Sequence, residues 1–286
     1  MLTVLSIVVD GVAYGMILFM ISVGLSVTMG LMRVINLAHG AFAAIAGALA
    51  HWLILGMGMN FYLASLIAVL IVVVGSIPLE RWVYRYIYAF DELPQVLATI
   101  GLTFIVIAGI NLLFGSTLLS IPFPEAFSGT VDVGFRTLPM HRLVVIVVGL
   151  MVIAGLYILI DRTRYGIHLR AAVDNRGTAS ALGIDTTKIY ALTFALGAGL
   201  AAVGGILGAE LLPIDANYPL RYIIYILIVV AVGGLGSITG SFLAAIGLGI
   251  VDTASRYLVP EYGTVFFFVV MILILAVRPK GLLGRA

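Results

Sequence analysis

The sequence predicts an all-α fold, a polytopic bundle of transmembrane helices. Hydrophobic residues make up 63% of the 286 residues and charged residues only 10%, and the mean hydropathy is +1.22. Soluble domains carry about 25% charged residues, so a chain of this composition cannot bury its apolar surface in water. Several windows without any charge are at least about 18 residues long, which is enough to cross a bilayer as a helix. We therefore expect residues 1–286 to form a single transmembrane domain.

Apolar windows and the Gly- and Pro-rich turns between them predict eight or nine spans. The spans fall near residues 4–31, 40–57, 61–79, 96–115, 142–160, 189–211, 221–235, 240–258 and 264–277. The stretch 221–258 fits either two spans or one re-entrant hairpin. No basic region precedes the first apolar run, so we expect a retained span there and not a signal peptide. Gly11 and Gly15, like Gly204 and Gly208, have the four-residue spacing at which helices pack closely.

The Lys and Arg residues predict the orientation, because positive residues in short loops are retained on the cytoplasmic side. The segment 161–188 holds Arg162, Arg164, Arg170, Arg176 and Lys188, and the C-terminal tail adds Arg278, Lys280 and Arg285. This distribution places both segments inside, and the outer loop 116–141 and the N-terminus outside. Arg136 and Arg142 run against the rule, although two residues in a longer loop do not overturn it.

Composition also excludes several kinds of site. The net charge is only +2 and no continuous basic face is present, so nothing supports the binding of nucleic acid. Cysteine is absent, which excludes disulfides and thiolate chemistry. The four histidines, His39, His51, His141 and His168, fall at unrelated places of the predicted topology, and His39 has no neighbour at metal-ligand spacing. We therefore expect neither a metal site nor an intramembrane catalytic site.

Two segments of the chain match each other without a gap. Residues 40–47, GAFAAIAG, align with residues 240–247, GSFLAAIG. Each copy follows a long apolar span that ends in a polar or glycine-rich break, at 32–39 and at 233–239. Broken helices at membrane depth are tolerated only where protein or a water-filled cavity covers them, so such repeats of helix-break-helix units point to a transport pathway. A chance match among small-residue helices is the alternative.

Polar and small residues near these breaks are the candidate pathway residues. They are Asn36, His39 and Gly40 at the first break, Gly236, Ser237 and Thr239 at the second, and Thr99 and Thr103 one turn apart on the fourth span. Polar groups at such depth need partners. Asn36 and His39 either contact a solute or hold the break together, and the Thr hydroxyls either face the pathway or bond back to their own helix.

The basic segment contains a stretch, residues 170–183, that we interpret as one amphipathic helix. Ala172, Ala179 and Leu182 share one of its faces, and Gly183 fits a C-terminal cap. A face of alanines lacks the large anchors of a headgroup-bound helix, so we favour docking into a groove of another protein, with headgroup contact as the alternative. The candidate docking residues are Arg170, Asp174, Asn175, Arg176, Ala179 and Gly183.

Charged residues also mark the ends of spans. Glu210, Asp215, Asp252 and Arg256 fall near predicted outer ends, where water is within reach, so we expect interfacial solvation for each. Asp252 and Arg256 have the i, i+4 spacing that allows a helical ion pair. Asp185 is placed to cap the span that follows the basic segment.

Four stretches, in order along the chain, resemble permeases of the branched-chain amino-acid ABC importer family, specifically the LivH-like subunit. They are residues 30–40, GLMRVINLAHG; 97–101, LATIG; 170–184, from RAAVDN to the final GI; and 233–237, GGLGS, with 278–284, RPKGLLG. The resemblance implies a complex in the bacterial inner membrane with a LivM-like permease, two ABC ATPase subunits and a periplasmic solute-binding protein. It also implies that the segment 162–188 is the coupling segment, which docks on an ATPase.

The resemblance further implies a transport subunit that is not an enzyme and binds no cofactor itself. The chain has no GxxxxGK[ST] phosphate loop, so ATP and Mg belong to the ATPase partners. Branched-chain or other small amino acids are the implied solutes, while urea, short amides and small aromatic acids stay open because residues 211–219 depart from the pattern of the amino-acid members. An ATP-independent secondary transporter or channel is the alternative of another class, but no buried acid pair or charged ring supports it.

Overall fold

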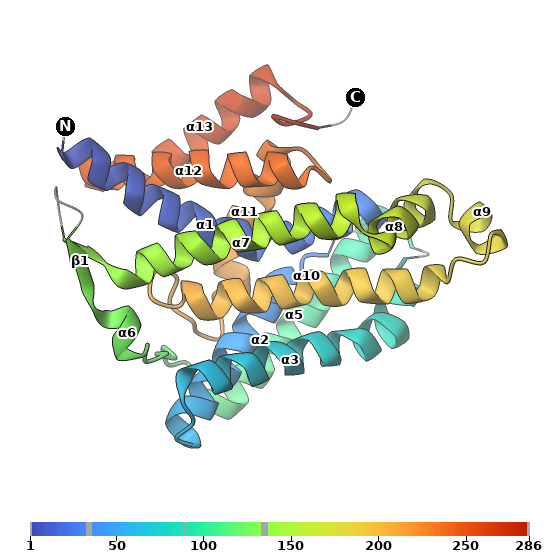
Figure 1. Cartoon of the computed structure of the whole chain (residues 1–286), viewed down its shortest axis with the longest axis horizontal. Coiled ribbons are helices and arrows are strands. Elements are labelled where there is room, and N and C mark those ends of the chain that lie inside the picture. Colours follow the sequence, from blue (N-terminus) through green and yellow to red (C-terminus); the bar gives the residue numbers. More distant parts are fainter. Residues whose placement is uncertain (1, 33–35, 89, 133–136, 285–286) are drawn as a thin grey trace.

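Apolar segments of this length satisfy their backbone hydrogen bonds internally when lipid surrounds them, and they therefore fold as helices. The computed structural model describes residues 2–32, 36–88, 90–132 and 137–284. Residues 33–35 of the first break, Arg136 of the outer loop and Arg285 of the tail lie outside the described residues. Figure 1 shows long helices that run roughly along one common direction.

Seven helices in the described ranges are long and apolar enough to cross a membrane. They are α1 (Leu2–Met32), α2 (His39–His51) with its π-helical extension η1 (Trp52–Gly56), α3 (Phe61–Leu79) with η2 (Glu80–Tyr84) and α4 (Arg85–Ile87), α5 (Glu92–Phe114), α7 (Met140–Arg162), α10 (Thr186–Gly208) and α12 (Ile238–Leu258). Two shorter apolar helices are α11 (Tyr218–Gly233) and α13 (Gly263–Val277). Each predicted segment is thus an apolar helix, and the stretch 221–258 contains two.

Short elements lie at opposite ends of the bundle. One end carries α6 (Glu125–Ser128) and a two-stranded antiparallel hairpin of β1 (Thr130–Asp132) and β2 (Thr137–Pro139). The other carries α8 (Arg164–Asp174) and α9 (Arg176–Ala181), while η3 (Pro260–Tyr262) connects α12 to α13. In Figure 1 the N-terminus lies at the same end as β1 and α6, opposite α9. The outer loop and the N-terminus therefore share one end, as the charge pattern predicts.

Helix α11 starts inside the bundle, because the chain before it runs inward as an irregular segment. The backbone N–H of Leu119 donates to the carbonyl of Ile214 at 2.8 Å, and the Ile214 side chain lies directly against Gly47 of α2. Pro219, in the first turn of α11, approaches Gly40 at the start of α2. A helix of 16 residues is only about 24 Å long, so the preceding segment covers the remaining depth.

Helices α1 and α10 form the centre of the bundle, while α3, α5 and α7 each leave a broad apolar surface exposed. Glycines allow α12 to cross α1 closely. A Cβ added at Gly15 would lie 2.7 Å from the carbonyl oxygen of Ala245, and one at Gly11 would lie 2.6 Å from the Cα of Ile250. Because side chains are absent at these positions, the two backbones are in van der Waals contact. The predicted role of Gly11 and Gly15 in packing is confirmed.

The predicted single helix over residues 170–183 is wrong. Asn175 has extended backbone angles, ends α8 and caps α9 by accepting a hydrogen bond from the Thr178 N–H at 2.9 Å. Ala179 is buried, but Leu182 is 77% exposed, so these two residues do not share a face. The side-chain oxygen of an Asn competes with the helix for backbone donors, which explains the interruption. Gly183 has the positive φ of +86° that its predicted capping role requires.

We expect Gly15→Val to destabilise the protein by about 1–3 kcal/mol, because the added atoms would overlap α12. The matched control is Gly155→Val on α7, where an added Cβ meets nothing within 4 Å. Thermal unfolding of the purified chain in detergent measures both variants. Equal melting temperatures for the two variants would contradict the glycine-mediated crossing.

Candidate functional site

The first break is held by side chains from two other parts of the bundle. Asn36 is buried, and its Oδ1 accepts hydrogen bonds from the Ala38 N–H at 3.0 Å and from the hydroxyl of Tyr84 in η2 at 2.8 Å. The Leu37 N–H donates to Oγ1 of Thr99 on α5 at 3.2 Å. These bonds replace intrahelical bonds that the break removes. Residues 36–38, the described part of the break, therefore form a hydrogen-bonded turn.

The break lies deep in the bundle. His39 begins α2, is 2% exposed and lies against Gly24 of α1. Gly24 in turn touches Gly197, the middle residue of α10. Nδ2 of Asn36 and Nε2 of His39 have no hydrogen-bond partner within the described part of the chain. Both nitrogen atoms therefore retain capacity for a further hydrogen bond.

The two threonines of α5 are buried and face the interior, as predicted. Thr103 bonds back to the carbonyl of Thr99 at 2.9 Å, and Thr99 bonds back to the carbonyl of Val96 at 3.0 Å. Thr99 alone also reaches the first break. At Gly40, an added Cβ would lie 3.4 Å from Pro219, so this glycine keeps α2 close to α11.

The second break is built from glycines and a helix cap. Gly234 and Gly236 have positive φ values of +97° and +80°, a conformation that glycine adopts without strain. Ser237 caps α12, its hydroxyl accepting from the Gly240 N–H at 3.0 Å. Thr239 is exposed and points away from the buried side of this break. Of the predicted residues at this break, only Ser237 has a defined polar contact in the described structure.

Backbone atoms connect the two breaks. A Cβ at Gly30 of α1 would lie 1.9 Å from the Cα of Gly236, so the end of α1 lies directly against the second break. Deeper in the bundle, the hydroxyl of Ser241 donates to that of Ser26 at 2.9 Å, and both side chains are fully buried. This bond between α12 and α1 was not predicted. Ser241 lies in the second copy of the repeat, whereas Ser26 lies outside both copies, so no signal in the sequence pairs them.

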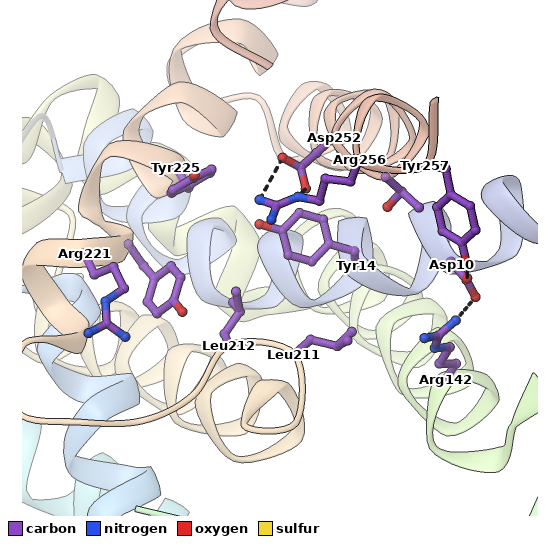
Figure 2. Close-up of a pocket in the computed structure, with 12 residues that line it drawn as sticks. Asp10, Tyr14, Arg142, Leu211, Leu212, Arg221, Tyr225, Asp252, Arg256 and Tyr257 are labelled. Carbon is purple, nitrogen blue, oxygen red and sulfur yellow. Dashed lines mark hydrogen bonds and ion pairs between the residues drawn. The ribbon is translucent and has the colours of Figure 1, made fainter. Parts of the chain in front are cut away.

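The end of the bundle that carries the N-terminus contains a cavity of about 420 Å³ that the sequence did not predict (Figure 2). We call it the outer cavity, after the predicted orientation of the chain. It lies between α1, α7, α11, α12 and the segment after α10, and its lining includes Asp10, Tyr14, Arg142, Leu211, Leu212, Arg221, Tyr222, Tyr225, Asp252, Thr253, Arg256 and Tyr257. Acidic, basic, aromatic and aliphatic side chains thus meet around one space.

Two ion pairs shape the outer cavity. Arg142 pairs with Asp10, which also accepts a hydrogen bond from the Tyr257 hydroxyl at 3.0 Å. Arg256 binds Asp252 through two nitrogens, at 2.7 and 3.2 Å. Asp10 and Asp252 are 7% and 2% exposed. Buried carboxylates of this kind are expensive unless they are paired, and in membrane spans they commonly mark functional sites.

The expected interfacial solvation is wrong for Asp252, which is buried in its ion pair, while the predicted pairing with Arg256 is confirmed. Asp215 is mostly buried and pairs with Arg221. Glu210 is 46% exposed, in agreement with the prediction, and lies 2.9 Å from Nδ1 of His141. The distance of a residue from the end of its span could not predict these differences in exposure. The buried residues are surrounded by neighbouring helices and not by water.

A second cavity of about 410 Å³ lies beneath the outer loop, and we call it the loop cavity. His141 and Glu210 line it together with Phe123, Phe127 and Ser128. Nε2 of His141 lies 2.8 Å from the carbonyl oxygen of Leu207. None of the predicted pathway residues lines either cavity. The described residues also contain no group of three or more His, Asp or Glu side chains that could hold a metal ion.

The basic segment at the other end is tied to the bundle by its charged residues. Arg170 donates to the carbonyl of Ile160 at 2.6 Å and pairs with Asp161 at 3.2 Å. The guanidinium of Arg176 lies 4.9 Å from the centre of the Tyr190 ring on α10, a cation–π distance. Ala179 faces the bundle, so it cannot itself dock on another protein.

The remaining predicted residues of this segment lie toward its surface. Asp174 and Asn175 are exposed. Asp185 caps α10 by accepting from the Lys188 N–H at 2.9 Å, as predicted. Leu182, which the sequence analysis places on the apolar face of this segment, is exposed at the end of α9 and is the large apolar side chain of this turn. The hydrophobic character of Leu182 could not by itself distinguish it from the hydrophobic residues that are buried.

Comparisons with known proteins cover nearly the whole chain. Residues 7–275 match the family described as "Branched-chain amino acid transport system / permease component". The chain is 30% identical to the high-affinity branched-chain amino acid transport system permease protein LivH of Escherichia coli strain K12, over 96% of this chain and 94% of the relative. It is 29% identical to BraD, of the same description, from Pseudomonas aeruginosa, over 97% and 94%.

A more distant relative is the probable branched-chain amino acid transport permease protein LivH of Methanocaldococcus jannaschii, at 26% identity over 96% of this chain and 90% of the relative. No solved structure matches the chain. A family match over residues 7–275 includes both breaks, the basic segment and all the helices that line the outer cavity. The chain is therefore a multi-pass membrane protein and a transport subunit that belongs to the permease family of branched-chain amino acid transport systems.

Proposed function

We propose that this chain is the membrane-spanning permease of an ABC importer and forms, with a LivM-like second permease, the pathway for branched-chain or other small amino acids. A periplasmic binding protein delivers the solute, and the complex lies in the bacterial inner membrane. The match of residues 7–275 to the permease family carries this proposal. The relatives named for branched-chain amino acid transport support the solute class.

Two ABC ATPase subunits supply the energy in this proposal, and ATP and Mg are bound there. The coupling segment 162–188 then faces the cytoplasm, and the outer loop 116–141 and the N-terminus face the outside. The positive-inside distribution supports this orientation. A single transmembrane domain carries both the pathway and the coupling segment, so no movement between separate domains is needed.

Helix α10 is the mechanical link that we propose between the ATPases and the pathway. It starts at Thr186, within the last residues of the coupling segment, and the guanidinium of Arg176 lies over the ring of Tyr190 on this helix. At its middle, Gly197 touches Gly24, which lies against His39 at the first break. A displacement of α9 is therefore passed to the break through one continuous helix, because a packed helix moves as a rigid element.

Asn36, His39, Gly40 and Thr99 form the pathway side of this proposal at the first break, with Gly236 and Ser237 at the second. The contacts of Asn36 and Thr99 support a role in holding the break, and the unpartnered nitrogens of Asn36 and His39 support contact with a polar solute. These two roles are compatible, because different atoms of Asn36 carry them. Thr103 and Thr239 have no contact that supports a part in the pathway.

We expect ATP-dependent uptake of leucine, isoleucine or valine when this chain is co-expressed with its second permease, ATPases and binding protein in membrane vesicles. Because partner ATPases provide the energy, omitting them abolishes uptake even in the presence of an ion gradient. A parallel panel contains urea, a short amide and a small aromatic acid. Uptake that persists without the ATPases would contradict the importer and favour a secondary transporter.

We expect Leu182→Glu to weaken binding of the ATPase subunits, because it places a charge on the exposed apolar residue of the proposed docking turn. Co-purification of the ATPases with the permease measures this, and uptake falls in parallel. Leu118→Glu is the matched control, since Leu118 is 65% exposed near the opposite end of the bundle. Retained co-purification by the Leu182 variant would remove this turn from the docking surface.

We expect Asn36→Ala to lower the free energy of unfolding by about 1–3 kcal/mol, because it orphans the Ala38 N–H and the Tyr84 hydroxyl. Tyr84→Phe removes one of the same bonds and costs about 0.5–1.5 kcal/mol. The double variant costs less than the sum of the two, because the shared hydrogen bond is lost only once. Strict additivity in thermal unfolding would show that this bond does not stabilise the break.

A further inference from the structure

We infer that the outer cavity binds the solute as a zwitterionic amino acid, with its carboxylate at the arginines and its ammonium at the aspartates. This inference rests on the proposed function and specifies where an amino acid is first held by the permease. It concerns a site that is separate from the two helix breaks, since none of the break residues lines the cavity.

The charges of the cavity match a zwitterion better than a simple ion. Asp10 with Arg142 and Asp252 with Arg256 supply two negative and two positive groups around one space. Arg221, which also lines the cavity, pairs with Asp215, so the charges of all three pairs compensate each other and no net charge favours a simple cation or anion. A free amino acid carries both charges close together and can bridge an acidic and a basic side chain at once.

The pair of Asp252 and Arg256 is accessible on its cationic side. The side chain of Arg256 is 54% exposed, whereas the side chain of its partner Asp252 is 3% exposed. Its hydrogen bonds to Asp252 use two nitrogens, whereas a guanidinium has five N–H donors. The donors that are left suit a carboxylate, which arginine binds in a bidentate manner. Because the two residues lie one turn apart on α12, this pair does not link two helices.

The remaining walls supply apolar and aromatic surface. Leu211 and Leu212 line one side, and Tyr14, Tyr222 and Tyr225 line others. In Figure 2 the two leucines lie across the cavity from Asp252 and Arg256, with Tyr14 between them. A volume of about 420 Å³ falls in the lower part of the usual range for small-molecule pockets, about 300–1,000 Å³. Charged groups therefore face an aliphatic wall, as an amino acid with an aliphatic side chain requires.

The absence of cysteine from the chain allows a direct test of occupancy. Thr253→Cys introduces a thiol into the lining of the outer cavity, next to Asp252. A membrane-impermeant maleimide is added from outside to the assembled complex, without binding protein, and labelling is read on this chain after electrophoresis. Ser128→Cys, in the lining of the loop cavity, is the matched control.

We expect L-leucine at about ten times its dissociation constant to slow labelling of the Thr253→Cys chain about tenfold, because only the unoccupied cavity admits the reagent. Isoamylamine, which lacks the carboxylate, and isocaproate, which lacks the ammonium, have little effect. Labelling of the Ser128→Cys chain is unchanged by all three compounds. Adding Asp252→Asn and Arg256→Gln to the Thr253→Cys chain abolishes the protection by leucine.

Each other outcome overturns a definite part of the inference. Leucine uptake by the complex without protection of Thr253→Cys removes the outer cavity as a binding site and leaves the proposed function intact. Equal protection by isoamylamine or isocaproate shows that the cavity does not recognise a zwitterion. Protection that survives neutralisation of Asp252 and Arg256 shows that this pair, which lies within α12, does not bind the solute. Failure of the unmodified complex to take up any amino acid overturns the proposed function itself.

Discussion

A peptide group in hydrocarbon must find its hydrogen bond within the protein, and the irregular parts of this chain are organised by that requirement. At the first break, Asn36 and Thr99 supply the missing bonds. In the segment before α11, Ile214 is bonded to Leu119. At the second break, the tail returns so that Leu282 donates to the carbonyl of Val232 at 2.7 Å. In the described part of the chain, these three departures from the helical conformation are covered by hydrogen bonds from neighbouring segments.

The requirement for hydrogen bonds within the protein also explains why backbones approach each other closely. A covered break needs neighbours at short distance, and glycines provide it where α1 meets α10 at Gly24, and where α1 meets the second break at Gly30. Both contacts bring polar backbone near a break without any side chain between. Helix α1 is therefore the common neighbour of both breaks, which explains its central and buried position.

Much of this fold could be predicted from the sequence, because hydropathy and loop charge are properties of whole segments and not of single residues. The nine apolar helices and the positions of both breaks follow from such signals. The split at Asn175 could not be predicted, since an Asn is tolerated within a short polar helix and only its cap geometry reveals the interruption. The hydrogen bond of Asn36 to Tyr84 joins residues 48 positions apart, and no local pattern contains it.

The candidate site was less predictable than the fold for the same reason. Asp252 and Glu210 occupy similar places near span ends, yet one is buried in an ion pair and the other is exposed. The difference depends on which helices surround each residue. The outer cavity itself is formed by α1, α7, α11 and α12 together with the segment after α10, so it exists only after these elements have packed.

The distribution of charge along the bundle suggests where the proposed import cycle requires energy. The outer cavity carries full charges, whereas the described polar side chains at the first break are an amide, an imidazole and hydroxyls. Transfer of a zwitterion from charged partners to neutral ones loses electrostatic stabilisation, and the loss is larger where water is excluded. The unfavourable step therefore lies between the cavity and the break. Helix α10 borders the first break and starts in the proposed coupling segment, so in the proposed cycle the work of the ATPases would enter the pathway at this step.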